Sequence, residues 1–361
     1  MNMLKLFLSF SFLFCFLVAT GWSQELKDYY TPVSNPVYHW DARSSTFVRP
    51  VFLYQQLPDK VEFRKDVKAL LKDLGIYDTA RKLDGDIYGV ALQFSYAVNN
   101  RLSLVAVKSG YISCDPDDDS LIDDGNGFAD LAAGFQYSFL YQPKSNFVAS
   151  LRAVVELTNG DDHIYQGNGD GNLNLGLLFL KGFNKLQFSG AIGVVIPFDR
   201  DEEDTIFYDS WHLGYNVTPR FHPFLELNHF YTLASGDRDL NDVTYLGQPL
   251  DQVINAVVSD PGLTKTEKAE ILAGALRDLL HSGQKDDVVA AVASFSGCDL
   301  VNLGGAHSTE NESWVSLALG FRYRLTKWLT VGTSYEFLLT DEEETLMNNR
   351  LLVDAIISFS F

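Results

Sequence analysis

Apolar and polar residues alternate with a period of two along several stretches of this chain. In residues 314–325 every second position is apolar, and the positions between them hold serine, alanine, glycine and arginine. The same alternation runs through 87–98, 128–141 and 350–361. Because successive side chains of a β-strand point to opposite faces, the pattern predicts strands with one apolar face and one small or polar face.

Twelve segments of about 10–14 residues show strand character, which is near the length that a tilted transmembrane strand requires. Their even number is typical of bacterial single-chain barrels. They are 45–57, 86–98, 101–113, 128–141, 146–158, 172–183, 185–196, 207–217, 222–235, 313–325, 327–340 and 349–361.

The connections between these segments alternate between short and long. The short ones, such as 99–101 and 184–185, each hold a lysine or arginine, whereas the long ones include acidic runs such as 115–124 and 199–204. A soluble β-sandwich has no reason to alternate in this way. A membrane barrel does, with tight periplasmic turns, long external loops and both termini in the periplasm.

The two ends of the chain agree with export. Residues 1–23 have a short basic start, a brief apolar run and small residues at the exit, which is the pattern of a cleaved signal peptide. The terminal strand closes on Phe361 and resembles the last strand of bacterial outer-membrane barrels, which the barrel-insertion machinery reads. The alternative is the edge strand of a soluble sandwich.

Composition narrows the class further. The chain is 46% hydrophobic and 13% aromatic, yet residues 24–361 contain no run of 18 apolar residues, which argues against an inner-membrane helical protein. A formal net charge of −19 argues against nucleic acid as a partner. The predicted fold is all-β: a twelve-stranded antiparallel transmembrane β-barrel formed by 24–361.

Two helical insertions are predicted in the long loops, at about 60–83 and 249–294. In the second, Thr264 and Glu267 form a capping box, and leucine and alanine follow at helical spacing. Either insertion could cover the mouth of the barrel, fold inward as a plug or bind a partner.

Inward-facing charged residues are the candidate functional residues. A twelve-stranded barrel is narrow, so opposed charges could line an aqueous path and set its selectivity. The alternative is a structural ion-pair network that fills and stiffens the barrel. The predicted pore-lining residues are Arg49, Arg152, Glu156, Glu226, Arg322, Arg324, Glu336, Arg350 and Asp354.

Other chemistry is weakly indicated. The acidic loops depart from the twelve-residue calcium loop, so no metal site is predicted, and no motif indicates a cofactor. Catalytic residues are not predicted either, because no histidine and serine share a strand in the arrangement of a lipid-facing hydrolase. Cys114 and Cys298 both fall in predicted long loops on one side, which allows a disulfide between them.

Two short motifs carry a family resemblance. Residues 125–137 and 223–228 are similar to a Gly-x-x-Asp stretch and a Pro-x-x-Glu stretch of the outer-membrane barrels grouped with the meta-pathway of phenol degradation. The resemblance implies a passive channel or carrier for small molecules, including aromatic or hydrophobic ones. The helical insertions depart from that group's simpler pattern.

These observations predict energy-independent passage of a small solute across the outer membrane of a Gram-negative bacterium. The expected partners are outer-membrane lipid, the solute and the insertion machinery. A plugged structural or interaction barrel, whose acidic loops bind a partner or surface lipid, is the alternative. An outer-membrane lipid hydrolase is a third hypothesis.

Overall fold

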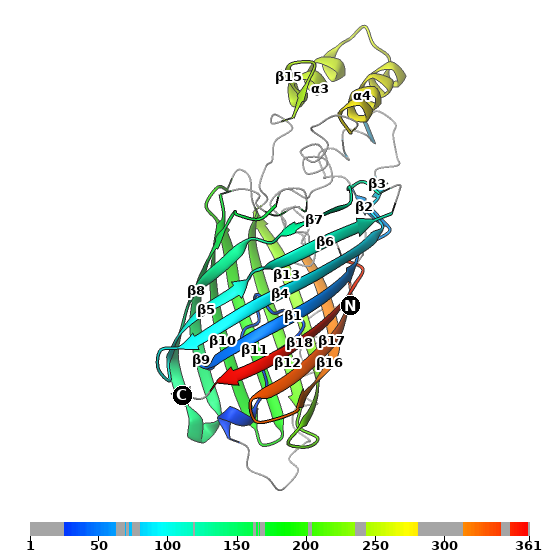
Figure 1. The fold of residues 1–361 in the computed structure, drawn as a ribbon. Helices are drawn as coiled ribbons and strands as arrows, with labels where there is room; N and C mark the ends of the chain where they lie inside the picture. Colours follow the sequence, from blue (N-terminus) through cyan, green and yellow to red (C-terminus); the bar gives the residue numbers. More distant parts are fainter. Residues whose placement is uncertain are drawn as a thin grey trace, which may run out of the picture.

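The computed structural model describes residues 25–62, 69, 72–73, 80–117, 120–161, 164, 166, 170–200, 204–234, 243–280, 313–340 and 347–359. In this part of the chain, antiparallel strands close into a single barrel (Figure 1). Its strands are β1 (Thr46–Gln56), β4 (Gly85–Ala97), β5 (Leu102–Lys108) with β6 (Gly110–Pro116), β7 (Gly125–Phe128) with β8 (Leu131–Gln142), β9 (Phe147–Leu157), β10 (Asn172–Phe183), β11 (Leu186–Pro197), β12 (Thr205–Tyr215), β13 (Phe221–Ala234), β16 (Ser313–Arg324), β17 (Leu329–Leu338) and β18 (Asn349–Phe359).

The first and last strands close the barrel. β1 pairs with β18 on one side, with Thr46 opposite Phe359, and with β4 on the other. All twelve predicted strands are present, but two of them are interrupted. One breaks at Ser109 between β5 and β6, and its neighbour breaks between Phe128 and Leu131. The predicted twelve-stranded antiparallel barrel is therefore confirmed.

The two faces of the wall differ as the alternation predicts. Outward side chains are large and apolar, for example Val90 with 55% of its surface exposed and Leu319 with 48%. Inward positions beside them hold buried polar residues such as Gln93, Ser95 and Ser316. An apolar outer band of this kind suits contact with hydrocarbon. Among the described residues, no helix is both long and apolar enough to cross a membrane.

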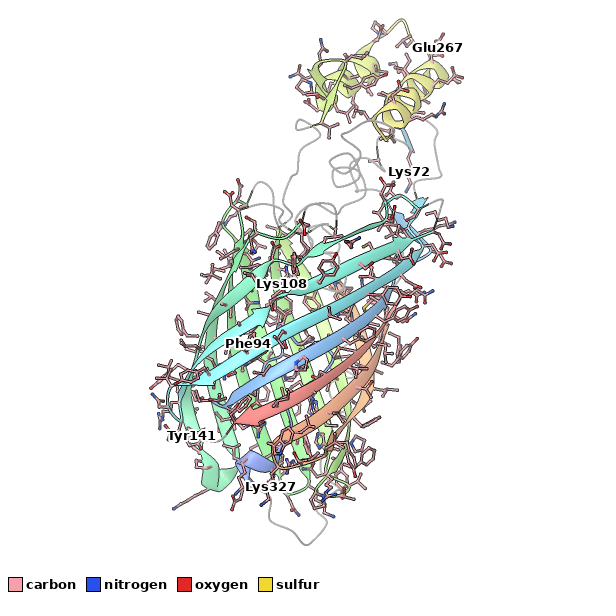
Figure 2. All side chains as sticks on the ribbon, in the orientation of Figure 1. Lys72, Phe94, Lys108, Tyr141, Glu267 and Lys327 are labelled. Atoms are coloured by element: carbon pink, nitrogen blue, oxygen red, sulfur yellow. The ribbon has the colours of Figure 1, made fainter. Side chains whose placement is uncertain are left out.

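Short turns gather at one end of the barrel and long loops at the other. Lys327 marks the short-turn end, and Lys72 and Glu267 lie beyond the opposite end (Figure 2). The described helices of the second insertion, α3 (Leu250–Ser259) and α4 (Lys265–Leu280), lie beyond the long-loop end (Figure 1). This part of the insertion therefore does not enter the barrel.

The helical insertions are predicted partly correctly. The capping box is present, with the Glu267 backbone N–H donating to Thr264 Oγ1 at 3.3 Å and the Thr264 N–H donating to Glu267 Oε2 at 2.8 Å. Residues 281–312, including the predicted helix at 286–294, lie outside the described residues.

The ends of the first insertion are strands, β2 (Lys60–Glu62) and β3 (Ala80–Lys82), where a helix was expected. The barrel strands β1 and β4 bring Gln56 opposite Asp86. The chain therefore leaves the barrel and re-enters it at neighbouring positions, and the two ends of the insertion pair as β2 and β3. Residues 69, 72 and 73 are helical.

The lumen is occupied by the chain's own N-terminal segment, residues 25–45, which we call the plug. It begins with the 3₁₀ turn η1 (Leu26–Asp28) at the short-turn end (Figure 1). It reverses direction near Asn35, whose carbonyl accepts the His39 N–H at 2.9 Å, and returns to the short-turn end, where Ser44 Oγ donates to Asn99 O at 2.7 Å. The plug is a re-entrant loop, and Val33 and Trp40 within it are almost fully buried.

Candidate functional site

Two arginines and one aspartate form the central anchor of the plug. Arg49 Nε and Arg322 Nη1 each donate to the Asp354 carboxylate at 2.6 Å, and all three side chains are fully buried. The same guanidinium groups also hold the plug backbone: Arg322 Nε donates to Thr31 O at 2.6 Å, and Arg49 Nη2 donates to Pro32 O at 3.1 Å. One carboxylate cannot accept from every N–H group of two arginines, and the plug carbonyls accept from some of the remaining N–H groups.

Glu226 forms a second anchor on β13, the strand that pairs with β16 of the first anchor. Its two carboxylate oxygens accept consecutive backbone N–H groups of the plug, from Val33 at 2.9 Å and Ser34 at 2.6 Å. His212 Nδ1 lies 2.7 Å from the same carboxylate and His222 stacks on His212. Hydrogen bonds to an ionised group are stronger than neutral ones, so this carboxylate is a principal attachment point.

Neutral side chains hold the two limbs of the plug. Gln187 Oε1 accepts the Tyr30 N–H at 2.7 Å, and its Nε2 donates to Tyr30 O at 2.6 Å. On the other limb, Gln136 Nε2 donates to Asp41 O at 2.8 Å, and Ser150 Oγ donates to Ala42 O at 2.5 Å. An irregular segment can be buried only if its backbone groups find partners, and the barrel wall supplies them here.

The structure places all nine predicted residues on the lumen side and brings several together. Besides the Asp354 cluster, Arg350 lies 3.7 Å from Glu336, Glu156 accepts from Lys108 at 2.8 Å, and Arg324 Nη2 donates to the Asp28 carbonyl at 2.9 Å. Arg152 joins none of these pairs. That these residues line an aqueous path stays a prediction.

The sequence-based reasoning missed the plug and the neutral residues that hold it. Gln136, Ser150 and Gln187 occupy inward positions of predicted strands, but their partners are backbone atoms of 25–45, a segment without strand or helix periodicity. The available signal was a polar lumen combined with a stretch of some twenty residues between the predicted signal peptide and the first strand.

Cys114 also differs from its expected place. It lies in β6, not in a long loop, and its side chain is buried. Cys298 lies outside the described residues, so the disulfide between them stays a prediction.

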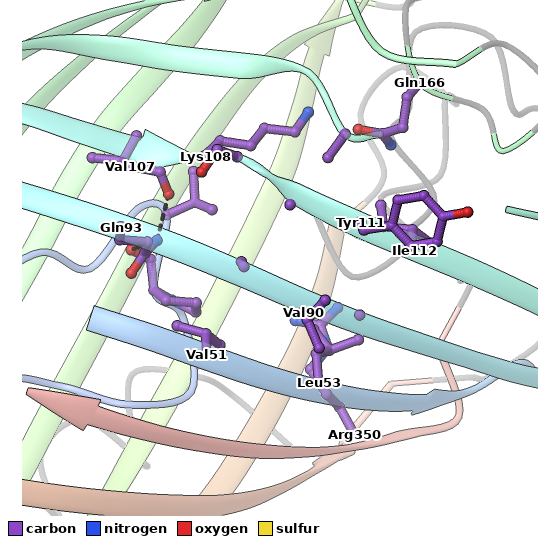
Figure 3. Close-up of a pocket in the computed structure, with 17 residues that line it drawn as sticks. Val51, Leu53, Val90, Gln93, Val107, Lys108, Tyr111, Ile112, Gln166 and Arg350 are labelled. Atoms are coloured by element: carbon purple, nitrogen blue, oxygen red, sulfur yellow. Dashed lines mark hydrogen bonds between the residues drawn. The ribbon is translucent and has the colours of Figure 1, made fainter. Parts of the chain in front are cut away.

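An apolar pocket opens in the wall where β5 gives way to β6 (Figure 3), with a cavity volume of about 80 Å³. Its lining combines the lumen-facing residues Gln93 and Arg350 with the outward-facing residues Val90 and Tyr111. The tip of the plug contributes Pro36 and Val37. The pocket therefore reaches from the outer face of the wall to the plug.

The outer wall carries a carboxylate–imidazole pair. His229 Nδ1 lies 2.8 Å from Asp209 Oδ2, and Trp211 Nε1 donates to Asp209 Oδ1 at 2.6 Å. A serine hydrolase needs a nucleophile within hydrogen-bond reach of such a histidine. In the part of the chain that the structure describes, no serine or cysteine is hydrogen-bonded to His229.

Gly182 is a point where the wall makes room for the plug. A Cβ atom at this position would lie 2.0 Å from the Tyr29 ring, whose hydroxyl donates to Asn184 O at 2.8 Å. We expect Gly182→Ala to displace this ring and to loosen the plug by about 1–3 kcal/mol, since a buried aromatic contact and a hydrogen bond are lost. Faster tryptic cleavage after Arg43, which is largely buried in the folded plug, would report the loosening.

Gly190→Ala on the neighbouring strand is the matched control. Its Cβ atom would lie 2.7 Å from the ring of Phe179, a residue of the wall on the strand that pairs with it, and not from the plug. Equal cleavage rates in the two variants would contradict the assignment of Gly182 as a plug contact.

Comparison with known proteins identifies the fold class. No family model and no curated protein matches this chain. An outer-membrane channel from Pseudomonas putida F1 aligns with 87% of this chain and 96% of its own, with a TM-score of 0.52 and 12% identity. The NanC porin covers 87% of this chain and 100% of its own, with a TM-score of 0.42 and 8% identity. At 12% identity the likeness to the Pseudomonas channel concerns the fold alone, which is an antiparallel β-barrel.

Proposed function

We propose that this protein is an outer-membrane channel for the passive passage of a small solute, and that the plug gates it. The observation that carries the proposal is the plug itself, which occupies the lumen and is held there through hydrogen bonds from wall side chains. Water or a polar solute can replace such bonds when the plug moves. The proposal includes export by a signal peptide at 1–23 and residence in a Gram-negative outer membrane.

The pocket beside the plug tip supports a solute with an apolar body. Val51, Leu53 and Ile112 line it together with Val37 of the plug, so a hydrophobic or aromatic group would meet complementary surface there (Figure 3). This agrees with the solute class that the resemblance to the phenol meta-pathway barrels implies. The proposal also includes that this chain belongs to that group of barrels.

A plugged structural barrel is the second candidate. It is favoured by the completeness of the plug's attachment, in which Arg49, Arg322 and Glu226 hold consecutive backbone groups from Thr31 to Ser34. In that case the plug would never leave, and the loop end with α3 and α4 would be the functional surface. A test of plug movement separates the two candidates.

A covalent lock provides this test. Asn228 Nδ2 donates to Ser34 Oγ at 3.1 Å, so a Ser34→Cys/Asn228→Cys variant places one thiol on the plug and its partner on the wall. The variant is made with Cys298 replaced by serine. We expect the oxidised protein to show almost no conductance in planar bilayers and the reduced protein to conduct like the wild type, because only the reduced plug can leave the lumen.

The single-cysteine variants control for the substitutions themselves. Equal conductance before and after reduction would overturn gating by the plug. A complete absence of current in the reduced lock, the wild type and Gly182→Ala would overturn passage and leave the structural barrel as the function.

A further inference from the structure

Arg152 differs from the other buried arginines of the lumen. It is 2% exposed, and among the described residues its three guanidinium nitrogens make no ion pair and no well-formed hydrogen bond, with the Tyr208 hydroxyl as a polar group beside them. Arg49, Arg322 and Arg350, by contrast, each pair with a carboxylate. A buried guanidinium without an acceptor is costly, so the position of Arg152 needs an explanation other than an ion pair.

The neighbours of Arg152 are hydrogen-bond donors engaged with the plug. In the strand register, Arg152 lies opposite Gln136 on one side and Gly176 on the other, and Ser150 is two positions away on the same face. Gln136 Nε2 donates to Asp41 O and Arg43 O, while Ser138 and Ser150 donate to Ala42 O. Three consecutive carbonyl oxygens of the plug thus occupy the donors beside Arg152.

A glycine in the wall leaves room for the Arg152 guanidinium. Arg152 and Tyr208 both lie over Gly176, where any side chain would intrude, since a Cβ atom there would be 2.7 Å from the Tyr208 hydroxyl. Tyr208 Oη donates to Asn174 Oδ1 at 2.9 Å, which leaves it able to accept one more hydrogen bond. No carboxylate is paired with Arg152 within the described ranges.

We propose that Arg152, with Gln136, Ser138 and Ser150, is the binding site for a carboxylate group of the passing solute. When plug residues 41–43 withdraw, three donors lose their carbonyl partners beside a guanidinium that is paired with no carboxylate of the described residues. A carboxylate supplies two oxygens that satisfy these donors and a charge that matches Arg152. The inference rests on the proposed passage and deepens it: the solute is a small organic anion.

The test uses benzoate and its uncharged analogue benzamide on the full chain in planar bilayers. In the wild type and in the Gly182→Ala background, we expect millimolar sodium benzoate to reduce the chloride current saturably and benzamide to leave it unchanged. We expect Arg152→Gln to abolish the effect of benzoate and to lower the anion-to-cation permeability ratio several-fold, whereas Arg152→Lys retains most of both.

Arg101→Gln, at an exposed short turn, is the control for loss of a positive charge. A wild-type current that benzoate leaves unaffected, or a permeability ratio equal in wild type and Arg152→Gln, would overturn the anion site and leave passage intact. The benzoate measurement on the wild type decides the matter even if Arg152→Gln does not fold. A wild type and Gly182→Ala that never conduct would overturn passage and this site together.

Discussion

Replacing Asp354 by alanine is expected to destabilise the barrel by about 3–5 kcal/mol, because two buried guanidinium groups lose the carboxylate between them. Arg49 and Arg322 both donate to this carboxylate at 2.6 Å and are inaccessible to solvent. Their remaining acceptors are neutral carbonyls of the plug, which cannot offset two charges. The temperature at which the folded barrel converts to its unfolded electrophoretic form should fall steeply.

Two further variants separate charge from shape. Asp354→Asn keeps the volume and should be nearly as unstable as the alanine variant, since the amide carries no charge. Asp170→Ala removes an exposed aspartate and should leave the transition temperature unchanged. A stable Asp354→Asn barrel would show that the cluster is held by packing and not by its charges.

Replacing Glu226 by glutamine is expected to release the plug while leaving the barrel folded. The amide group of glutamine presents one oxygen where the carboxylate presents two, so the N–H groups of Val33 and Ser34 cannot both be accepted with full strength. Hydrogen bonds to a charged group contribute about 1.5–3 kcal/mol each. A loss of about 2–4 kcal/mol raises the released population about 30- to 1,000-fold.

Tryptic cleavage after Arg43 measures this population when the plug opens and closes faster than the protease cuts. In the folded plug, Arg43 is ion-paired with Asp41 and its side chain is 15% exposed. We expect faster cleavage and a higher open probability in bilayers for Glu226→Gln. Glu156→Gln, which removes a lumen carboxylate paired with Lys108, is the control. Equal behaviour of the two variants would refute Glu226 as a plug anchor.

The strands and their facing were predictable because they depend on a local rule. Alternation in 87–98 or 314–325 assigns each side chain to lipid or lumen without reference to any other strand, since the strand period is two. The capping box at Thr264 and Glu267 is equally local, since donor and acceptor are three residues apart. The inward positions of Arg49, Arg322 and Asp354 followed from the same period.

Which inward-facing residues bind one another in the lumen was not predictable in this way. Arg49 and Asp354 are 305 positions apart in the chain, and Glu226 holds Val33 across 193 positions. Barrel closure and strand stagger decide which inward groups meet, and neither is encoded in any one strand. The strand pair formed by β2 and β3 shows the same dependence, because the pairing of β1 with β4 brings its ends together.

The alternation of side chains by itself determined that this chain forms a barrel with an apolar exterior and a polar interior. The reason is that each strand places its apolar side chains toward hydrocarbon and its polar side chains toward the lumen. Only the tertiary structure decided that residues 25–45 fill that interior. This segment has no periodicity of its own, and the hydrogen-bond partners of its backbone lie on distant strands that only the closed wall brings together.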